Sequence, residues 1–208
     1  MVRTTLVAVG ALLLVSPVLY AQTDSSIAVG VAVTFYDPAN ADAFHPTGFG
    51  LVGRLRRGSG LGATVGMDWF TSDLRVDVGG QSTPVGRMTI RPLMAGVSYI
   101  RQYHRYAVST GVVGGWSLNS LSQSDVERAA YGTRVGIPGA SVSISNCLAV
   151  EPNVTFWYEL GHHFAASASV AYMLARPTLT ARGPAGTHAD TISLSATVIT
   201  FALVYGVF

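Results

Sequence analysis

Histidine and cysteine side chains are the first candidates for chemistry in this sequence, because they act as general bases, nucleophiles and metal ligands. Cys147 is the single cysteine, so the chain can form neither an internal disulfide nor a multi-cysteine metal site. The adjacent pair His162 and His163 would point to opposite sides of an extended chain, and no histidine has a serine two positions later. The Gly-x-Ser-x-Gly motif is absent, and a phosphate-binding Gly-Lys motif is impossible because the chain contains no lysine. The sequence therefore predicts no catalytic residue, no cofactor and no metal site.

Charged residues form a second candidate group, because several of them occur in segments where apolar and polar residues alternate. If these segments are strands, the charges on their polar sides all point to one face of the sheet. An isolated charge on an enclosed face is costly, so the charges there are expected to pair with one another. Such a cluster either fills the interior of a barrel as a structural network or lines a narrow polar conduit. The charged residues assigned to this cluster are Arg54, Asp68, Arg91, Glu151 and Glu159.

The elements that must position these charges are recognised by a hydrophobic period of two. Segment 26–36 shows it most clearly, since its odd-numbered residues are large and apolar and its even-numbered residues are small, polar or aromatic. In a small membrane barrel the large apolar set faces lipid, and the other set faces a narrow lumen. In a soluble β domain the same set would face a core. The odd-numbered set is Ile27, Val29, Val31, Val33 and Phe35.

Eight segments carry this alternation, and the connections between them alternate in length. Short turns and long loops, the latter rich in Gly, Pro, Ser, Asp and Asn, follow one another, as expected for a barrel with short periplasmic turns and long extracellular loops. The predicted strands are 26–36, 49–56, 61–69, 93–100, 106–116, 150–159, 164–172 and 191–208. The predicted long loops are 37–47, 71–86, 117–141 and 176–190, and the short turns are 57–60, 101–105 and 161–163.

An irregularity is predicted at Pro92. Before it the apolar residues Met88 and Ile90 are even-numbered, whereas after it the apolar set is odd-numbered and begins at Leu93. A regular strand keeps its side-chain parity, so the switch predicts a β-bulge at this proline. The bulge would keep Arg91 in the lumen, as a member of the charged cluster.

The first residues resemble a cleavable secretory signal. Arg3 precedes an apolar run, Leu6–Val15, and Ala21 is a plausible last residue of the segment that is removed. We therefore expect residues 1–21 to be a signal peptide and residues 22–208 to form the barrel. The charged fraction is 12%, about half of the roughly 25% typical of soluble domains, while 49% of the residues are hydrophobic. This balance favours a surface that faces lipid, and no basic run indicates binding to nucleic acid.

The pattern resembles the superfamily of small outer-membrane β-barrels of the OmpA/OmpX type. Three segments carry the resemblance: 91–99, 174–177 and the C-terminal 204–208. The last is similar to the terminal assembly signal of that family, here with Tyr205 and Phe208 as its aromatic residues. One difference is that Gly206 occupies the position where the family places an aromatic residue. The resemblance implies an eight-stranded antiparallel up-and-down barrel in the bacterial outer membrane, recognised by the barrel-assembly machinery.

The expected function is that of a non-catalytic outer-membrane barrel with a structural or surface-loop binding role, surrounded by outer-membrane lipid and monomeric. Two alternatives remain at this point. One is a lipid-A-modifying barrel enzyme, although the His-x-Ser pair of deacylase-type barrels is absent. The other is a soluble periplasmic β-barrel that binds a small apolar ligand.

Overall fold

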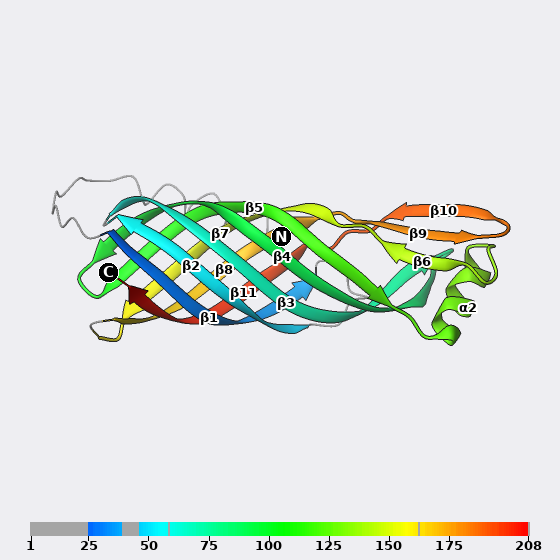
Figure 1. The fold of residues 1–208 in the computed structure, drawn as a ribbon, viewed down its shortest axis with the longest axis horizontal. Helices are drawn as coiled ribbons and strands as arrows, with labels where there is room; N and C mark the ends of the chain where they lie inside the picture. Colours follow the sequence, from blue (N-terminus) through cyan, green and yellow to red (C-terminus); the bar gives the residue numbers. More distant parts are fainter. Residues whose placement is uncertain (1–24, 39–45, 58, 162, 208) are drawn as a thin grey trace.

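The strands form one closed barrel in the computed structural model, which describes residues 25–38, 46–57, 59–161 and 163–207. Eight antiparallel strands close in the order β1-β11-β8-β7-β5-β4-β3-β2 (Figure 1). The predicted up-and-down barrel is confirmed, and a two-sheet sandwich is excluded because the hydrogen-bonded ladder has no open edge around the barrel. The barrel strands are β1 (Ser25–Pro38), β2 (Thr47–Arg57), β3 (Gly60–Val78), β4 (Gln81–Tyr103), β5 (Tyr106–Ser122), β7 (Cys147–Glu159), β8 (Phe164–Ala175) and β11 (Ala196–Val207). The expected signal peptide, 1–21, and Phe208 lie outside the described residues.

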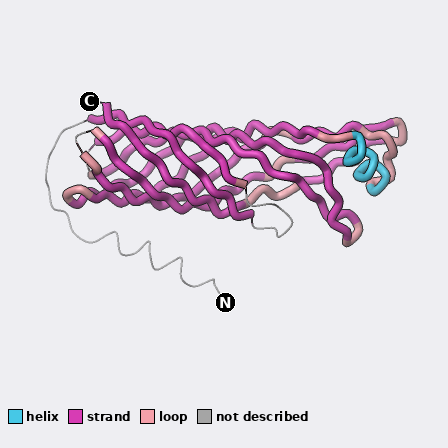
Figure 2. Tube along the Cα trace, turned by 90° about the horizontal axis from the view of Figure 1, so that it is seen from below, coloured by secondary structure: helices cyan, strands magenta, loops and turns pink. Residues whose placement is uncertain are grey.

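The end of the barrel away from the C-terminus carries an extension with its own secondary structure (Figure 1). A three-stranded sheet, β10-β9-β6, lies there beside helix α2, which Figure 2 shows against the strands. The segments predicted as long loops at 71–86, 117–141 and 176–190 are not loops throughout, because they continue the barrel strands or form new elements. The added elements are α2 (Asp125–Arg134), β6 (Ser141–Ile144), β9 (Thr178–Gly183) and β10 (Gly186–Thr191). No helix among the described residues is long and apolar enough to span a membrane.

Local chemistry explains two elements of the extension. Strands β3 and β4 are joined at Gly79 and Gly80, whose φ angles of 62° and 79° suit a tight hairpin turn. Helix α2 begins with a capping box, in which Ser124 and Glu127 each bond the other's backbone N–H. Hydrogen bonds that the backbone N–H and the hydroxyl of Ser124 donate to the Glu127 carboxylate lower the pKa of that carboxyl. Arg134, in the last turn, donates to Gln81 and so fastens the helix to β4.

The outer surface of the barrel is apolar, as the alternation predicted. Ile27, Val29 and Val31 are 51%, 51% and 61% exposed, whereas Ala32 and Thr34 are buried in the interior. Side chains of this kind gain nothing from contact with water, so the surface requires a lipid environment. Aromatic residues bound this apolar band at both ends and are also exposed. Toward the extension they are Phe35, Phe49, Trp69, Trp116 and Tyr172, and at the opposite end they include Tyr99, Tyr106, Phe164 and Tyr205.

The bulge predicted at Pro92 is wrong. Strand β4 pairs with β5 in one continuous register through Arg91, Pro92 and Leu93. The register shift lies earlier, where Leu74 pairs with Gly86 and Arg75 pairs with Pro84. Gly86 has a φ of 148°, and a Cβ there would meet the carbonyl oxygen of Ser122, so the irregular position requires glycine.

The apolar pattern changes parity at Pro92 because the medium outside the barrel changes. Met88 and Ile90 point inward and are each 2% exposed, whereas Leu93 points outward and is 56% exposed. Below this level lipid surrounds the barrel and large apolar residues face outward. Above it the strands project into water, so their apolar residues fill an interior core instead. The backbone stays regular while the location of the apolar side chains reverses.

Candidate functional site

The interior of the membrane-spanning part contains a small polar cavity of about 110 Å³. Arg54, Asp68 and Glu151 all line it. Asp68 accepts a hydrogen bond of 2.9 Å from the Thr34 hydroxyl, and the Arg54 guanidinium lies 4.3 Å from the centre of the Trp157 ring. The sequence therefore identified three residues that the fold brings together from β2, β3 and β7. That their charges compensate one another stays a prediction.

Two members of the predicted cluster lie elsewhere. Arg91 points to the outside of the barrel, where its guanidinium lies 5.3 Å from the ring centre of the exposed Trp69. Its assignment to the lumen depended on a bulge at Pro92, and without that bulge the odd-numbered side chains of β4 face outward. Glu159 is at the end of β7 and accepts a hydrogen bond of 3.3 Å from Gln102, away from the polar cavity.

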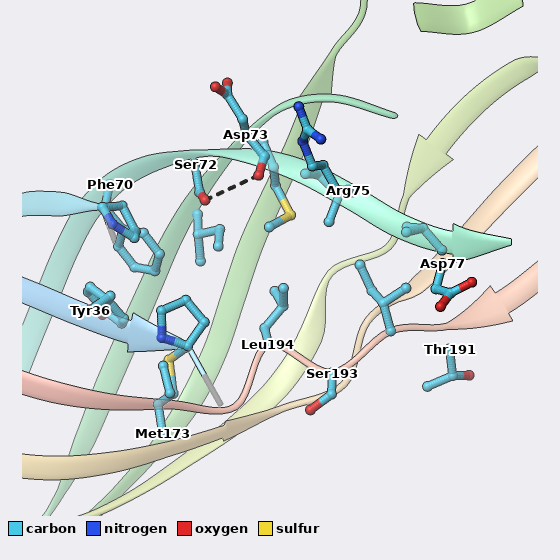
Figure 3. A pocket seen from close by; sticks show the side chains of 18 residues that line it. Tyr36, Phe70, Ser72, Asp73, Arg75, Asp77, Met173, Thr191, Ser193 and Leu194 are labelled. Atoms are coloured by element: carbon cyan, nitrogen blue, oxygen red, sulfur yellow. Dashed lines mark hydrogen bonds between the residues drawn. The ribbon is translucent and has the colours of Figure 1, made fainter. Parts of the chain in front are cut away.

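A second and larger cavity, of about 600 Å³, lies where the barrel passes into the extension. Its walls come from β1, β3, β4 and β8 and from the segment that leads from β10 into β11. Figure 3 shows Tyr36, Phe70 and Met173 together at one end of this cavity, and Asp77 and Thr191 toward the other end. The apolar lining residues include Tyr36, Phe70, Leu74, Val76, Met88, Ile90, Met173, Ile192 and Leu194. We call this space the upper cavity and the polar one the lower cavity.

On the side of the extension, β3 and Thr191 of β10 line the upper cavity. Ser72 of β3 is buried there, whereas Asp73, Arg75 and Asp77 alternate with the buried residues and are exposed. Beyond Trp69, β3 pairs only with β4 among the described strands, because its ladder with β2 stops at the pair Phe49 and Trp69. The upper cavity thus lies beside the part of β3 where the barrel wall gives way to the extension.

An apolar layer separates the two cavities. Tyr36 and Phe70 are each 3% exposed, and their rings stack with centres 3.7 Å apart. Two positions below them on the same strands, the Thr34 hydroxyl donates a hydrogen bond to Asp68, which lines the lower cavity. The layer is completed by other buried apolar side chains, among them Met94, Val113, Ala171 and Val198. Sequence reasoning missed this layer because its two aromatic members are 34 positions apart and fall in different strands.

We expect the stacked pair to block passage along the barrel axis. Replacing both residues, Tyr36→Ala and Phe70→Ala, removes the two largest side chains between the cavities and should join them into one space. The interior of an eight-stranded barrel is just wide enough for side chains to fill, so removing two large side chains leaves a continuous opening. In planar lipid bilayers the double variant is expected to give resolved current steps, and the unaltered protein none. The outward-facing pair Phe35→Ala and Phe49→Ala is the control. Resolved steps from the unaltered protein would contradict a closed layer.

Together, the closed eight-stranded barrel, its apolar outer band and its enclosed interior define a small transmembrane β-barrel of the outer-membrane type. Comparison with solved structures agrees with this class at the level of the fold. The outer membrane protein OprG from Pseudomonas aeruginosa has a TM-score of 0.75 at 12% identity, over 90% of this chain and 98% of that one. The E. coli outer membrane protein W has a TM-score of 0.56 at 12% identity, over 89% and 99% of the two chains. Neisserial surface protein A has a TM-score of 0.57 at 9% identity, over 88% and 96%.

No protein-family model matches the sequence, and no curated protein matches it either. At identities this low the similarity establishes the fold alone. A soluble periplasmic barrel, one of the alternatives left open by the sequence, is inconsistent with the exposed apolar band.

Proposed function

We propose that this protein is a non-catalytic outer-membrane barrel whose upper cavity binds a small, mainly apolar molecule taken up from the external medium. The upper cavity carries this proposal. Its volume of about 600 Å³ falls in the range of small-molecule sites, and such sites are mostly apolar with a few polar groups that fix orientation. Met88, Ile90 and Met173 supply the apolar surface, and methionine side chains adapt to ligands of different shape. Ser72 and Ser193 supply hydroxyl groups at the wall.

The position of the upper cavity supports binding from the outside. It lies on the side of the extension, which corresponds to the extracellular end because long connections of such barrels are extracellular. The Tyr36 and Phe70 stack closes it toward the lower cavity. A ligand held there is therefore shielded from the charged interior around Arg54, Asp68 and Glu151.

Methionine methyl groups offer a direct test of ligand binding. Met88 and Met173 line the upper cavity, Met94 lines the lower one, and Met67 belongs to the outward-facing set of β3. With ¹³C-labelled methionine methyl groups and naphthalene as the probe, we expect saturable shifts of the Met88 and Met173 signals. The Met67 signal should change only in proportion to the naphthalene dissolved in the surrounding lipid. Equal, non-saturating changes at all positions would contradict a binding site.

A pair of variants tests the location of binding. Leu194→Glu places a carboxylate in the wall of the upper cavity, where an unpaired charge is costly to bury with an apolar ligand. We expect the affinity for naphthalene to fall on the order of tenfold or more, since unpaired buried polar groups cost about 1–3 kcal/mol or more. Val126→Glu is the control, because Val126 lies on α2 and is 79% exposed. Equal affinity of the two variants would place the ligand outside the upper cavity.

A further inference from the structure

The outer surface of the barrel changes character in successive rows of side chains across β3, β4 and β5. The first row, which faces lipid, contains Leu93 and its partner Trp116, both exposed. The next row along β4 begins with Arg91, which pairs with Leu118. Arg91 is therefore placed at the boundary between the apolar band and the extension.

Hydroxyl groups follow directly above Arg91. Thr89 pairs with Thr71 on one side and with Ser120 on the other, and the Thr71 and Thr89 hydroxyl oxygens are 3.4 Å apart. In the row beyond them, Arg87 forms an ion pair of 3.4 Å with Asp73. These two charges compensate each other, so Arg91 supplies the uncompensated positive charge of these three rows.

The Arg91 guanidinium is held in place by its neighbours, but not all of its N–H donors have a hydrogen-bond partner among the described residues. It lies over the Trp69 ring and donates from Nη2 to the Ser120 hydroxyl at 3.4 Å. Its Nε has no hydrogen-bond partner among the described residues and is shielded from solvent, so the terminal nitrogens are the donors that an external anion can reach. Stacking on an aromatic ring fixes the plane of a guanidinium while leaving its edge donors free for an anion. A planar fork of N–H groups matches the oxygens of a phosphate group.

We propose that Arg91, Thr71, Thr89 and Ser120 form a binding site for the headgroup of a phosphorylated glycolipid in the outer leaflet of the membrane. The phosphate lies against Arg91, sugar hydroxyl groups bond the three side-chain hydroxyls, and the acyl chains run along Leu93, Trp116 and Leu118. The order of these rows, from apolar through cationic to hydroxyl-bearing, follows the order of groups in such a lipid. The site is on the outside of the barrel and is independent of the upper cavity.

Native mass spectrometry of the full mature barrel tests this site. The probe is bisphosphorylated lipid A, compared with the same glycolipid after removal of its phosphates. We expect the protein to retain the phosphorylated form more tightly on the order of tenfold, as for a hydrogen-bonded charge pair. Arg91→Met should abolish this preference. Arg91→Lys keeps the charge without the planar fork and should retain part of it.

The control is Arg101→Met, which removes an arginine stacked on an aromatic ring, Tyr103, at the other end of the same strand. It should bind like the unaltered protein, and heat-modifiable gel migration shows whether each variant is folded. Equal retention by Arg91→Met and the unaltered protein would overturn the proposal, as would an equal loss in Arg101→Met. Displacement of lipid A by inorganic phosphate at the same concentration would show a site for free anions, which also contradicts a lipid site.

Discussion

Replacing Arg54 by methionine should lower the free energy of unfolding by about 3–5 kcal/mol, the range for removing one partner of a buried ionic group. Arg54 is 5% exposed and lines the lower cavity together with Asp68 and Glu151. Without the guanidinium, the Asp68 and Glu151 carboxyl groups share the lower cavity without the positive charge of Arg54. The packing of Arg54 on Trp157 is lost as well. The measurement is urea unfolding in lipid vesicles, followed by tryptophan fluorescence.

A triple variant separates charge from packing. Arg54→Met combined with Asp68→Asn and Glu151→Gln removes the cation and both acids at once, at nearly constant volume. Most of the loss should be recovered, because replacing a whole buried ionic group costs much less than breaking it. If the triple variant is as unstable as Arg54→Met alone, the destabilisation comes from lost packing and the three charges do not compensate one another.

The second large effect is expected for Val31→Arg, which should cost about 2–4 kcal/mol. Val31 is 61% exposed in the middle of β1, with outward-facing Leu51 and Leu203 as its partners on the two neighbouring strands. An arginine near the bilayer midplane cannot reach the headgroups without distorting the lipid. The same unfolding measurement in vesicles gives the change in free energy.

The matched control is Val126→Arg on helix α2, where the valine is 79% exposed. Both substitutions place an arginine on an exposed surface, but one surface faces lipid and the other faces water. Val126 lies in the first turn, where a cation opposes the helix dipole, so its cost should stay below about 1 kcal/mol. Equal costs at the two positions would mean that Val31 does not face lipid.

The membrane-spanning part of the fold was predictable from the sequence because a single rule governs it. Where lipid lies outside and a narrow lumen inside, residues such as Ile27, Val29 and Val31 must alternate with small or polar ones. The positions of Arg54, Asp68 and Glu151 followed from the same rule, since strand parity alone decides which face a side chain takes. Short and long connections then fixed the number of strands.

The extension was not predictable by that rule, because water replaces lipid outside it. Met88 and Ile90 are apolar and point inward, so their parity suggested a bulge that the strand does not contain. The upper cavity was equally hidden, since Tyr36 meets Phe70 only after three strands are in register. Arg91 lies at the level where the surroundings of the barrel change from lipid to water. It was wrongly assigned to the lumen because the prediction assumed that lipid surrounds the whole length of the strand.

The pairing of β1 with β11 joins the first strand to the last one, and this affects how the barrel folds. The two strands share twelve residue pairs, from Ile27 with Val207 to Pro38 with Ala196, and the hydroxyls of Thr34 and Thr200 meet across it 166 positions apart. The most distant pairing in the chain therefore closes the ring, and it pays the largest loop-closure entropy of any ladder. Until β11 arrives, β1 presents a row of unpaired backbone donors and acceptors, the kind of edge that recruits strands of other molecules. We therefore expect closure to be a late, slow step, and we expect a chaperone that covers the free edge of β1 to raise the yield of barrels by suppressing pairing between chains.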